Sequence, residues 1–199
     1  MKPWPEDIQK KLDEASCKQL LVVRTDRHPA DIRWYERHLG RFVERRSLCA
    51  KGAIGFGGVT RDKREGDGCT PCGLFPVGEA FYIGRPPKTG LNRFAVTERT
   101  CWVDDPHSRY YNRRVEECGQ RDWESAERMM EYQEYVCGFV IEHNPACHPE
   151  KGSAVFFHVL ADPPEAFLAT GGCVAAPEPA VRRYLKRLCK KKHPYILIK

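Results

Sequence analysis

Short apolar runs separated by turn residues dominate the chain, and this pattern predicts strands. The runs are of the length expected for single strands, and they lie at residues 19–25, 73–83, 94–103, 136–142 and 194–199. Residues 32–49 alternate between apolar and polar positions and predict two further strands that meet at Gly40. Residues 152–159 predict another buried strand, with the polar His158 close to its end. The pattern therefore favours a β-rich fold.

Three segments have apolar residues at helical spacing instead. They are residues 4–16 with Trp4, Ile8, Leu12 and Ala15, residues 122–135 with Trp123, Ala126, Met130 and Gln133, and the segment after Pro177 with Val181, Tyr184, Leu185 and Leu188. Many strands with about three helices predict a mainly β fold with peripheral helices, built as a β-sandwich or an open barrel. We expect an N-terminal helical extension at residues 1–18 and one domain at residues 19–199.

The composition is that of a globular chain with a moderate positive charge. The 199 residues are 41% hydrophobic and 30% charged, with a formal net charge of +6. No apolar stretch approaches the roughly 20 residues of a membrane span, so no transmembrane segment is expected. An anionic partner suits the charge, but the basic residues are spread along the chain apart from residues 182–192. We interpret that cluster as a solvated helix face and expect no nucleic-acid partner.

Ten cysteines are a high number for this length. Such a density is typical of an oxidising compartment and predicts several disulfides, although their connectivity cannot be deduced from spacing. The positions are Cys17, Cys49, Cys69, Cys72, Cys101, Cys118, Cys137, Cys147, Cys173 and Cys189. If Cys173 stays reduced for chemistry, nine cysteines remain, and at least one of them is unpaired.

The chemistry of the chain is predicted at the segment Thr170-Gly-Gly-Cys173 and at His158. A thiol on a glycine turn and an imidazole near the end of a strand are the parts of a cysteine nucleophile with its base. We expect an imidazolium to lower the pKa of the Cys173 thiol. The amides of Gly172 and Cys173 are candidate oxyanion donors. A backbone carbonyl or Thr170 is expected to orient His158.

A second group of polar residues follows the strand that ends near Val103. It consists of Asp104, Asp105, Ser108, Tyr110 and Asn112. One interpretation is a cleft wall that binds the substrate peptide, together with Gly171, or orients the base. The other is a turn in which Asp and Ser hydrogen bond to their own backbone. The sequence weighs the two about equally.

The pair Cys69 and Cys72 allows three interpretations. A local or long-range disulfide ranks first and a redox-active pair second. Half of a zinc site with Cys147, His143 or His148 ranks last, because adjacent Cys and His residues provide poor ligand geometry. No metal site is predicted.

Several ordered motifs together resemble the L,D-transpeptidase (YkuD-type) catalytic domain family. They are Lys63-Arg-Glu-Gly-Asp-Gly-Cys-Thr-Pro-Cys-Gly-Leu-Phe75, Trp102-Val-Asp-Asp-Pro-His-Ser108, Tyr110-Tyr-Asn112, Gly152 to His158, and Thr170-Gly-Gly-Cys-Val174. Two positions differ from the common family pattern: Gly171 stands where many members have His, and Ala175 where many have Arg or Asn. The resemblance covers most of the chain after about residue 20.

The resemblance implies an L,D-transpeptidase-like β fold and an enzyme that acts on peptidoglycan stem peptides. Cys173 would form a thioester with the donor, and an amine (transpeptidation) or water (carboxypeptidation) would resolve it. Neither a metal nor an organic cofactor is implied. The expected partners are muropeptides or a peptidoglycan-linked protein. The expected location is the periplasm or the secreted cell envelope, with a leader absent from this chain, and residues 162–169 are the candidate lid.

Two other classes of function remain open from the sequence. The first is a non-catalytic, disulfide-stabilised envelope protein that binds peptidoglycan, in which Cys173 is oxidised or buried. The second is a thiol-disulfide oxidoreductase, in which Cys69 and Cys72 are the reactive thiols. The reactivity of individual cysteines distinguishes these classes from the enzyme.

Overall fold

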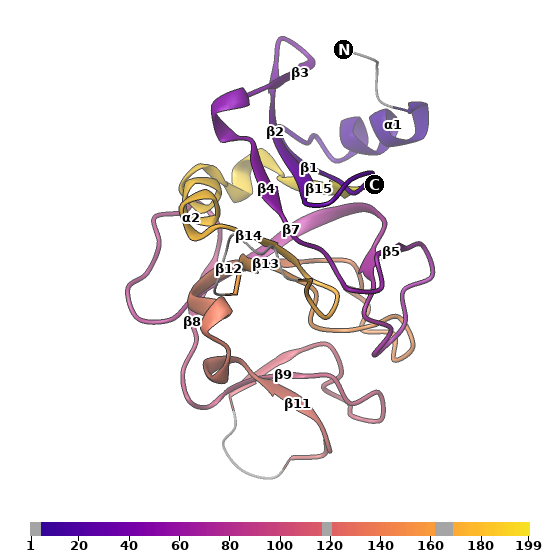
Figure 1. The fold of residues 1–199 in the computed structure, drawn as a ribbon, viewed down its shortest axis with the longest axis vertical. Coiled ribbons are helices and arrows are strands. Elements are labelled where there is room, and N and C mark those ends of the chain that lie inside the picture. The colour runs from indigo at the N-terminus through magenta and orange to yellow at the C-terminus, as the bar shows by residue number, and fades with distance from the viewer. Residues whose placement is uncertain (1–4, 117–120, 162–168) are drawn as a thin grey trace.

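The structure is a computed structural model that describes residues 5–116, 121–161 and 169–199. Its main element is a curled mixed sheet of ten strands that forms a half-barrel (Figure 1). The strand order is β14-β13-β12-β7-β15-β1-β2-β3, with β4 paired to β2 and β8 paired to β7. These strands are β1 Gln19–Arg24, β2 Ala30–His38, β3 Arg41–Glu44, β4 Ala50–Gly52, β7 Gly73–Tyr82, β8 Arg93–Ala95, β12 Cys137–Ile141, β13 Phe156–Val159, β14 Val174–Ala176 and β15 Tyr195–Ile198.

Two smaller sheets and a few helices complete the described part of the chain. One sheet has the order β10-β9-β11 and lies at the end of the molecule opposite α1 and β3 (Figure 1), and the other pairs β5 with β6. The bounds are β9 Thr100–Val103, β10 Arg114–Glu116, β11 Ala126–Arg128, β5 Val59–Thr60, β6 Thr70–Pro71, α1 Glu6–Glu14 and α2 Glu178–Arg187. Short 3-10 turns occupy Arg46–Leu48, Met129–Glu131, Gln133–Val136 and Lys190–Lys192. The prediction of a mainly β fold with peripheral helices is confirmed.

The helix predicted after Pro177 is α2, and its apolar face covers the sheet. Pro177 precedes the first helical residue, where its fixed φ and missing N–H cost nothing. Tyr184 is fully buried, stacks on Trp34 at 5.7 Å between ring centroids, and donates its hydroxyl to Leu48 O at 2.7 Å. On the exposed face, Arg182 donates to Glu178 at 2.6 Å, one helical turn away.

The predicted N-terminal helix is α1, and it packs on the sheet. Leu12 is fully buried in a cluster with Leu20, Tyr35 and Leu197. Arg37 of β2 donates to Asp13 at 2.5 Å. Trp4, which was expected on the same apolar face, lies outside the described residues. The segment before residue 19 therefore shares a hydrophobic cluster with β1, β2 and β15.

The helix predicted at residues 122–135 is wrong. Residues 126–128 form β11, which pairs antiparallel with β9, and two 3-10 turns follow it. Two aromatic residues of this segment pack against different partners. Trp123 meets Tyr110 edge-on at 5.8 Å, whereas Tyr135 meets Phe156 edge-on at 5.4 Å. Tertiary packing and strand pairing thus override the helical spacing.

Two predicted strands are shorter than expected. The segment 94–103 splits into β8 and β9, separated by a turn in which Thr97 and Thr100 hydrogen bond to each other. The segment 152–159 forms a strand only from Phe156 onward. Gly152 and Ala154 have φ values of +77° and +50°, in the left-handed region that strands do not use. This irregular stretch borders the cavity described below.

None of the helices in the described ranges is both long and apolar enough to cross a bilayer.

Candidate active site

One cavity of about 410 Å³ collects most of the predicted catalytic residues. His158 reaches it from β13, and Cys173 reaches it from the turn just before β14. The rest of the turn, Thr170, Gly171 and Gly172, forms part of the same wall. Other residues that line the cavity include Lys63, Glu65, Asp104, Glu127, Glu134, Tyr135 and Ser153.

The pairing of β13 with β14 places the thiol and the imidazole on one face of the sheet. The two strands are parallel, with Phe157 opposite Val174 and His158 opposite Ala175. Cys173 is therefore level with Phe156, two residues before His158. Since side chains alternate along a strand, Phe156 and His158 share a face.

The Cys173 thiol is held by the backbone of the irregular stretch before β13. Its S–H donates to Ala154 O at 3.3 Å, and the Phe156 N–H donates to its sulfur at 3.2 Å. Only 7% of the residue is exposed. Asn112 supports this stretch by accepting from the Ala154 N–H at 3.1 Å. The resting thiol proton thus points to a carbonyl rather than to the imidazole.

Two threonines hold the glycine turn. Thr170 Oγ1 donates to Cys173 O at 2.7 Å and accepts from the Gly172 N–H at 3.2 Å. Thr70 Oγ1 donates to the same carbonyl at 3.1 Å and accepts from the Gly55 N–H at 2.8 Å. The Gly172 amide, predicted as an oxyanion donor, is therefore occupied by Thr170 Oγ1. The Gly172 N–H would have to release Thr170 Oγ1 before it could donate to an oxyanion.

Gly172 is the glycine that this turn requires. Its φ of +142° lies in a region that other residues rarely adopt, and a Cβ there would stand 2.9 Å from Cys69 O. A Cβ on Gly171 would meet nothing within 4 Å, so Gly171 leaves space open to the cavity. The two glycines thus have different roles. Gly172 allows the backbone conformation of the turn, and Gly171 leaves space free beside the turn.

His158 is oriented by a backbone carbonyl. Its Nδ1 lies 2.7 Å from Val159 O, which fixes the tautomer with the proton on Nδ1. Nε2 is then unprotonated and able to accept a proton. The ring meets Tyr135 edge-on at 5.3 Å, and 7% of the residue is exposed. Of the two orienting groups predicted, the carbonyl rather than Thr170 contacts the ring.

Burial makes both members of the pair neutral. Desolvation raises the pKa of Cys173 to about 12, and Glu127 raises it further, against the Phe156 N–H and Lys63. Desolvation also lowers the pKa of His158, although Val159 O and Glu134 act in the other direction. The predicted imidazolium with a low-pKa thiolate is therefore wrong for the resting site. Two charges in this buried place would cost more than they regain.

Of the five polar residues predicted after β9, one lines the cavity and four hold the local structure. Asp104 lines the cavity. The carboxylate of Asp105 instead accepts from the N–H groups of His107 and Glu124, which lowers its pKa. These bonds hold the turn after β9 and join it to the segment that leads into β11.

The other three residues also hold backbone or neighbouring side chains. Ser108 Oγ accepts from the Tyr110 N–H at 3.0 Å and donates to Asp122 at 2.7 Å. The Asn112 amide accepts from Trp102 Nε1 at 3.0 Å as well as from Ala154. The turn interpretation thus describes Asp105, Ser108 and Tyr110. Asn112 acts on the cavity only by positioning residues 152–155.

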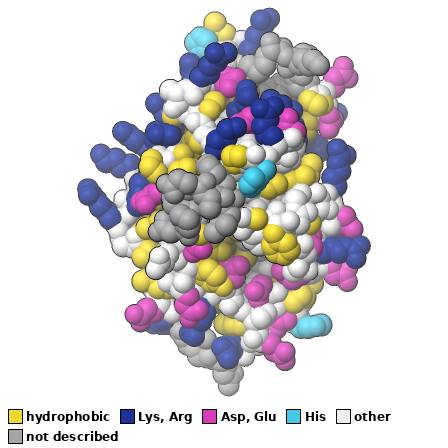
Figure 2. Space-filling view, viewed as in Figure 1, with side chains coloured by type: hydrophobic (Ala, Val, Ile, Leu, Met, Phe, Trp, Pro, Cys, Tyr) yellow, Lys and Arg dark blue, Asp and Glu magenta, His cyan; other side chains and the backbone are white. Residues whose placement is uncertain are grey.

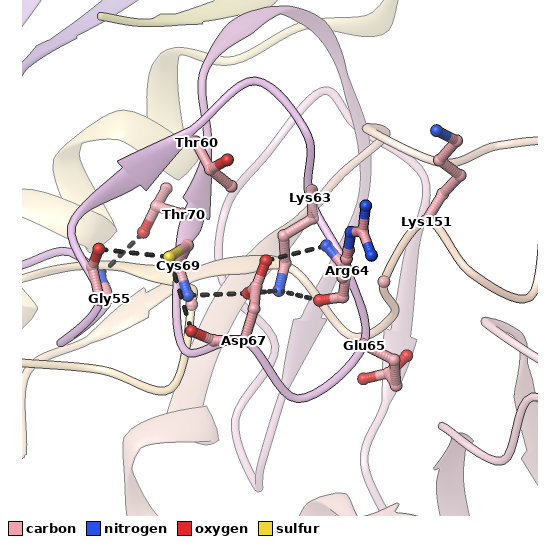
Figure 3. Close-up of polar contacts among 12 residues, drawn as sticks. Gly55, Thr60, Lys63, Arg64, Glu65, Asp67, Cys69, Thr70 and Lys151 are labelled. Carbon is pink, nitrogen blue, oxygen red and sulfur yellow. Dashed lines mark hydrogen bonds and ion pairs between the residues drawn. The ribbon is translucent and has the colours of Figure 1, made fainter.

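Lys63 is a cavity residue that sequence reasoning did not single out. Its side chain is 9% exposed, and Nζ donates to Asp67 at 2.5 Å and to Arg64 O at 2.9 Å (Figure 3). Burial would raise the pKa of Asp67, but hydrogen bonds from Lys63, the Arg64 N–H and the Cys69 N–H outweigh it and lower that pKa. Nζ lies 3.6 Å from where a Cβ on Gly172 would stand. A fixed cation thus adjoins the glycine turn.

Glu127 and Tyr135 were also missed, because residues 122–135 were predicted as a helix and neither residue belongs to its predicted apolar face. Tyr135 is 5% exposed and donates its hydroxyl to Glu127 at 2.7 Å. Desolvation raises the pKa of Glu127 to about 7, and Asp104 and Glu65 add to the effect, while the Tyr135 hydroxyl opposes it. No sequence pattern signalled this pair, since β11 depends on its pairing with β9.

The nine described cysteines are free thiols, and Cys118 lies outside the described residues. Cys69 and Cys72 flank the extended strand β6. Three extended residues span roughly 10 Å, beyond the roughly 7 Å limit between Cα atoms for a disulfide. A local Cys69–Cys72 disulfide is therefore incompatible with this backbone. Among the described residues no group of three His, Cys, Asp or Glu side chains can hold a metal ion.

Comparison with protein-family models finds no match to this chain. No curated protein sequence matches it either. Among solved structures, that of Bdellovibrio bacteriovorus Bd1075 is similar, with 13% identity and a TM-score of 0.49, over 94% of this chain and 49% of that one. This chain spans about half the length of that protein. At such values the similarity assigns neither family nor function, so the L,D-transpeptidase resemblance rests on the sequence motifs.

The neutral pair predicts how Cys173 reacts with an alkylating agent. With a pKa of about 12, its alkylation rate should rise by about tenfold for each pH unit between pH 7 and pH 10, because only the thiolate reacts. Peptide mapping by mass spectrometry after timed iodoacetamide treatment measures the rate at this one cysteine. The partly exposed Cys69 in the same digest is the control. A rate that is already constant above about pH 7 would contradict the assignment and restore the ion pair.

Glu127 should make stability depend on pH. Its folded-state pKa of about 7 lies above the ordinary 4.5, so the folded protein holds the extra proton in that window. Stability therefore falls as pH rises from about 4.5 to about 7, by up to about 3 kcal/mol. Glu127→Gln, which keeps an acceptor for Tyr135, should raise Tm by several degrees at pH 8 and leave it unchanged near pH 4. The exposed Glu131→Gln is the control, and an equal gain at both pH values would refute the explanation.

Proposed function

We propose that the protein is a cysteine-dependent acyl transferase or hydrolase of L,D-transpeptidase type, acting on peptidoglycan stem peptides. The observation that carries the proposal is the cavity in which the Cys173 thiol and the unprotonated Nε2 of His158 share one face of the sheet. The sequence motifs add the substrate class. The periplasm or secreted envelope, with muropeptides or a peptidoglycan-linked protein as partners, belongs to the same proposal.

The chemistry would begin from the neutral pair. The S–H would first turn from Ala154 O towards His158 Nε2. Nε2 then takes the thiol proton as the sulfur attacks the donor carbonyl, and the carbonyl oxygen becomes an oxyanion. The imidazolium then returns the proton to the leaving amine, the C–N bond breaks, and a thioester to Cys173 remains. An amine or water next attacks the thioester, gives one proton to Nε2, and the thiolate is released and reprotonated. At the end of these reaction steps Cys173 and His158 are neutral again, and no oxidation or reduction has taken place.

The resting neutrality fits this order of events. A thiolate in the empty cavity would be exposed to alkylation and oxidation. In the neutral pair, charge develops only when a carbonyl is present to accept the electron pair. Lys63, next to the glycine turn, opposes the raised pKa of Cys173 and is placed to stabilise the negative charge as it forms. The Cys173 amide and an exchanged Gly172 amide are the oxyanion donors that we propose.

A non-catalytic peptidoglycan-binding protein is the second candidate. The burial of Cys173 and its raised pKa favour it, since both are properties of an inert thiol. The oxidoreductase is disfavoured by the extended backbone between Cys69 and Cys72. A turnover assay separates enzyme from binder.

The assay follows purified tetrapeptide and pentapeptide muropeptides by mass spectrometry. The wild type should form crosslinked dimers or remove the terminal residue. Cys173→Ala should show no product, because the thioester cannot form. His158→Gln should lose about 100-fold or more of the rate, since it removes the base. Cys72→Ser, away from the cavity, should retain full activity.

Melting curves of each variant show whether the fold is preserved. If wild type leaves every muropeptide unchanged while the Cys173 thiol is free, the enzymatic proposal is wrong. Binding of the same muropeptides without turnover would then identify the second candidate.

A further inference from the structure

The exposed side of α2 is formed by four basic residues, Arg182, Arg183, Lys186 and Arg187. The 3-10 turn that follows the helix adds Lys190–Lys192, which are also exposed. Lys and Arg side chains project from the left edge of the molecule in Figure 2, on the side where α2 lies in Figure 1. We call Arg183, Lys186, Arg187 and Lys190–Lys192 the basic face.

The cations of the basic face have no acidic partner in the part of the chain that the structure describes. Arg182, beside them, is paired with Glu178 at 2.6 Å, whereas none of the six forms an ion pair with a described carboxylate. Exposed cations near the first strands do have such partners, as Arg45 has Glu36 at 3.1 Å. The basic face therefore concentrates positive charge that the fold does not compensate.

Helix geometry explains only part of this concentration. The helix macrodipole favours cations in the last turn, where Lys186 and Arg187 lie. It does not account for Arg183, which lies before the last turn and repels Arg187 one turn further on. The consecutive side chains of Lys190–Lys192 also repel one another. An anionic partner would remove this repulsion, since it would place opposite charge beside each cation.

The backbone under the basic face is fixed by a buried side chain, that of Gln19. Its Nε2 donates to Arg187 O at 2.8 Å, and its Oε1 accepts from the Cys189 N–H at 3.0 Å. The Lys190 N–H donates to Gly90 O at 3.0 Å and so ties the 3-10 turn to the loop before β8. Because these segments are held in place, a partner would have to order only the side chains of the cations.

The basic face and the cavity lie on opposite sides of the sheet. On β13, Phe157 meets Tyr184 of α2 edge-on at 5.8 Å, whereas the next residue, His158, lines the cavity. Successive residues of a strand point to opposite faces. The helix α2 therefore covers the face of the sheet that is turned away from Cys173. A partner bound to α2 would leave the cavity open.

The surroundings of the basic face favour an extended anionic surface over a small anion or a nucleic-acid strand. Lys190 lines a cavity of about 250 Å³, but Glu79 and Glu142 line it too and would repel an anion. Tyr184 is the one aromatic residue of residues 178–192 and is fully buried, so no ring there can stack on a base. Clusters of Lys and Arg on a helix are typical of contact with anionic phospholipid headgroups.

We propose that the basic face docks the protein on a bilayer that contains anionic phospholipids. The choice of a bilayer among polyanions rests on the proposed function, which places the protein in the cell envelope. The lipid phosphates pair with the six cations that have no partner within the described chain. The cavity, on the other side of the sheet, then faces away from the membrane and stays accessible to its substrate.

The test is co-sedimentation of the protein with vesicles in about 0.1 M salt. One set of vesicles is phosphatidylcholine alone, and in the other about a third of the lipid is phosphatidylglycerol. The protein should bind only the second set. Each Lys or Arg near an anionic surface contributes about a fivefold factor to binding. The triple variant Lys186→Gln, Lys190→Gln, Lys191→Gln should therefore bind about 100-fold more weakly. Salt at about 1 M should release the wild type, because it screens the charges.

The control is the triple variant Arg61→Gln, Arg113→Gln, Lys151→Gln, which lowers the net charge by the same amount. These three residues are exposed and lie in segments next to β5, β10 and the stretch before β13, away from α2. The control should bind anionic vesicles within about threefold of the wild type, because charges further than about 10 Å from the surface are screened. Melting curves of both triple variants show whether the fold is preserved.

Three results would overturn the docking surface: equal binding to both sets of vesicles, no binding to either, or equal losses in the two triple variants. A DNA duplex is the competing polyanion in the same buffer. Tighter binding of the duplex than of anionic vesicles, lost in the Lys186, Lys190 and Lys191 variant, would assign the basic face to nucleic acid and reject the bilayer.

Vesicle binding needs no turnover, so the two proposals fail separately. Binding to anionic vesicles through the basic face, without conversion of any muropeptide, would retain the docking surface and reject the enzyme. Conversion of muropeptides by a wild type that ignores anionic vesicles would retain the enzyme and reject the docking surface.

Discussion

The parallel pairing of β13 with β14 is the constraint on which the site depends. It places Cys173 level with Phe156, and so puts the thiol and the His158 ring on one face. A shift of one residue in this register would send the thiol to the opposite face. The register is secured outside the ladder, because Thr170 and Thr70 both donate to the Cys173 carbonyl. Two threonine side chains outside the strand pair thus help to determine where the Cys173 thiol lies.

Burial then shifts the pKa values of Cys173, His158 and the nearby Glu127. The same desolvation that keeps Cys173 and His158 neutral also raises the pKa of Glu127 and leaves Asp104 Oδ1 unpaired. A low local dielectric strengthens each interaction that a bound ligand would make. A ligand of complementary charge would therefore gain from each polar group of the cavity.

Most of the sheet could be predicted from apolar runs, and turn residues such as Asp26, Gly84, Asp104 and Pro194 mark the ends of several of them. α2 was likewise predictable, since Pro177 marks its start and Tyr184 and Leu185 its buried face. The segment 122–135 could not be predicted locally. Its residues have helical spacing, and only the pairing of Glu127 with Trp102 in β9 makes β11 a strand. Short strands that depend on distant partners carry little signal of their own.

The same distinction applies to the site. Cys173, His158 and the glycine turn were predictable because turn chemistry and motif order are local properties. Asp105, Ser108 and Tyr110 have the residue types of a binding wall, yet their groups are consumed by the turn that they form. Lys63 and Glu127 reach the cavity only through tertiary contacts, one from the loop before β6 and the other from β11. Residue type and motif order therefore find the proposed nucleophile, whereas the charged groups around it depend on the fold.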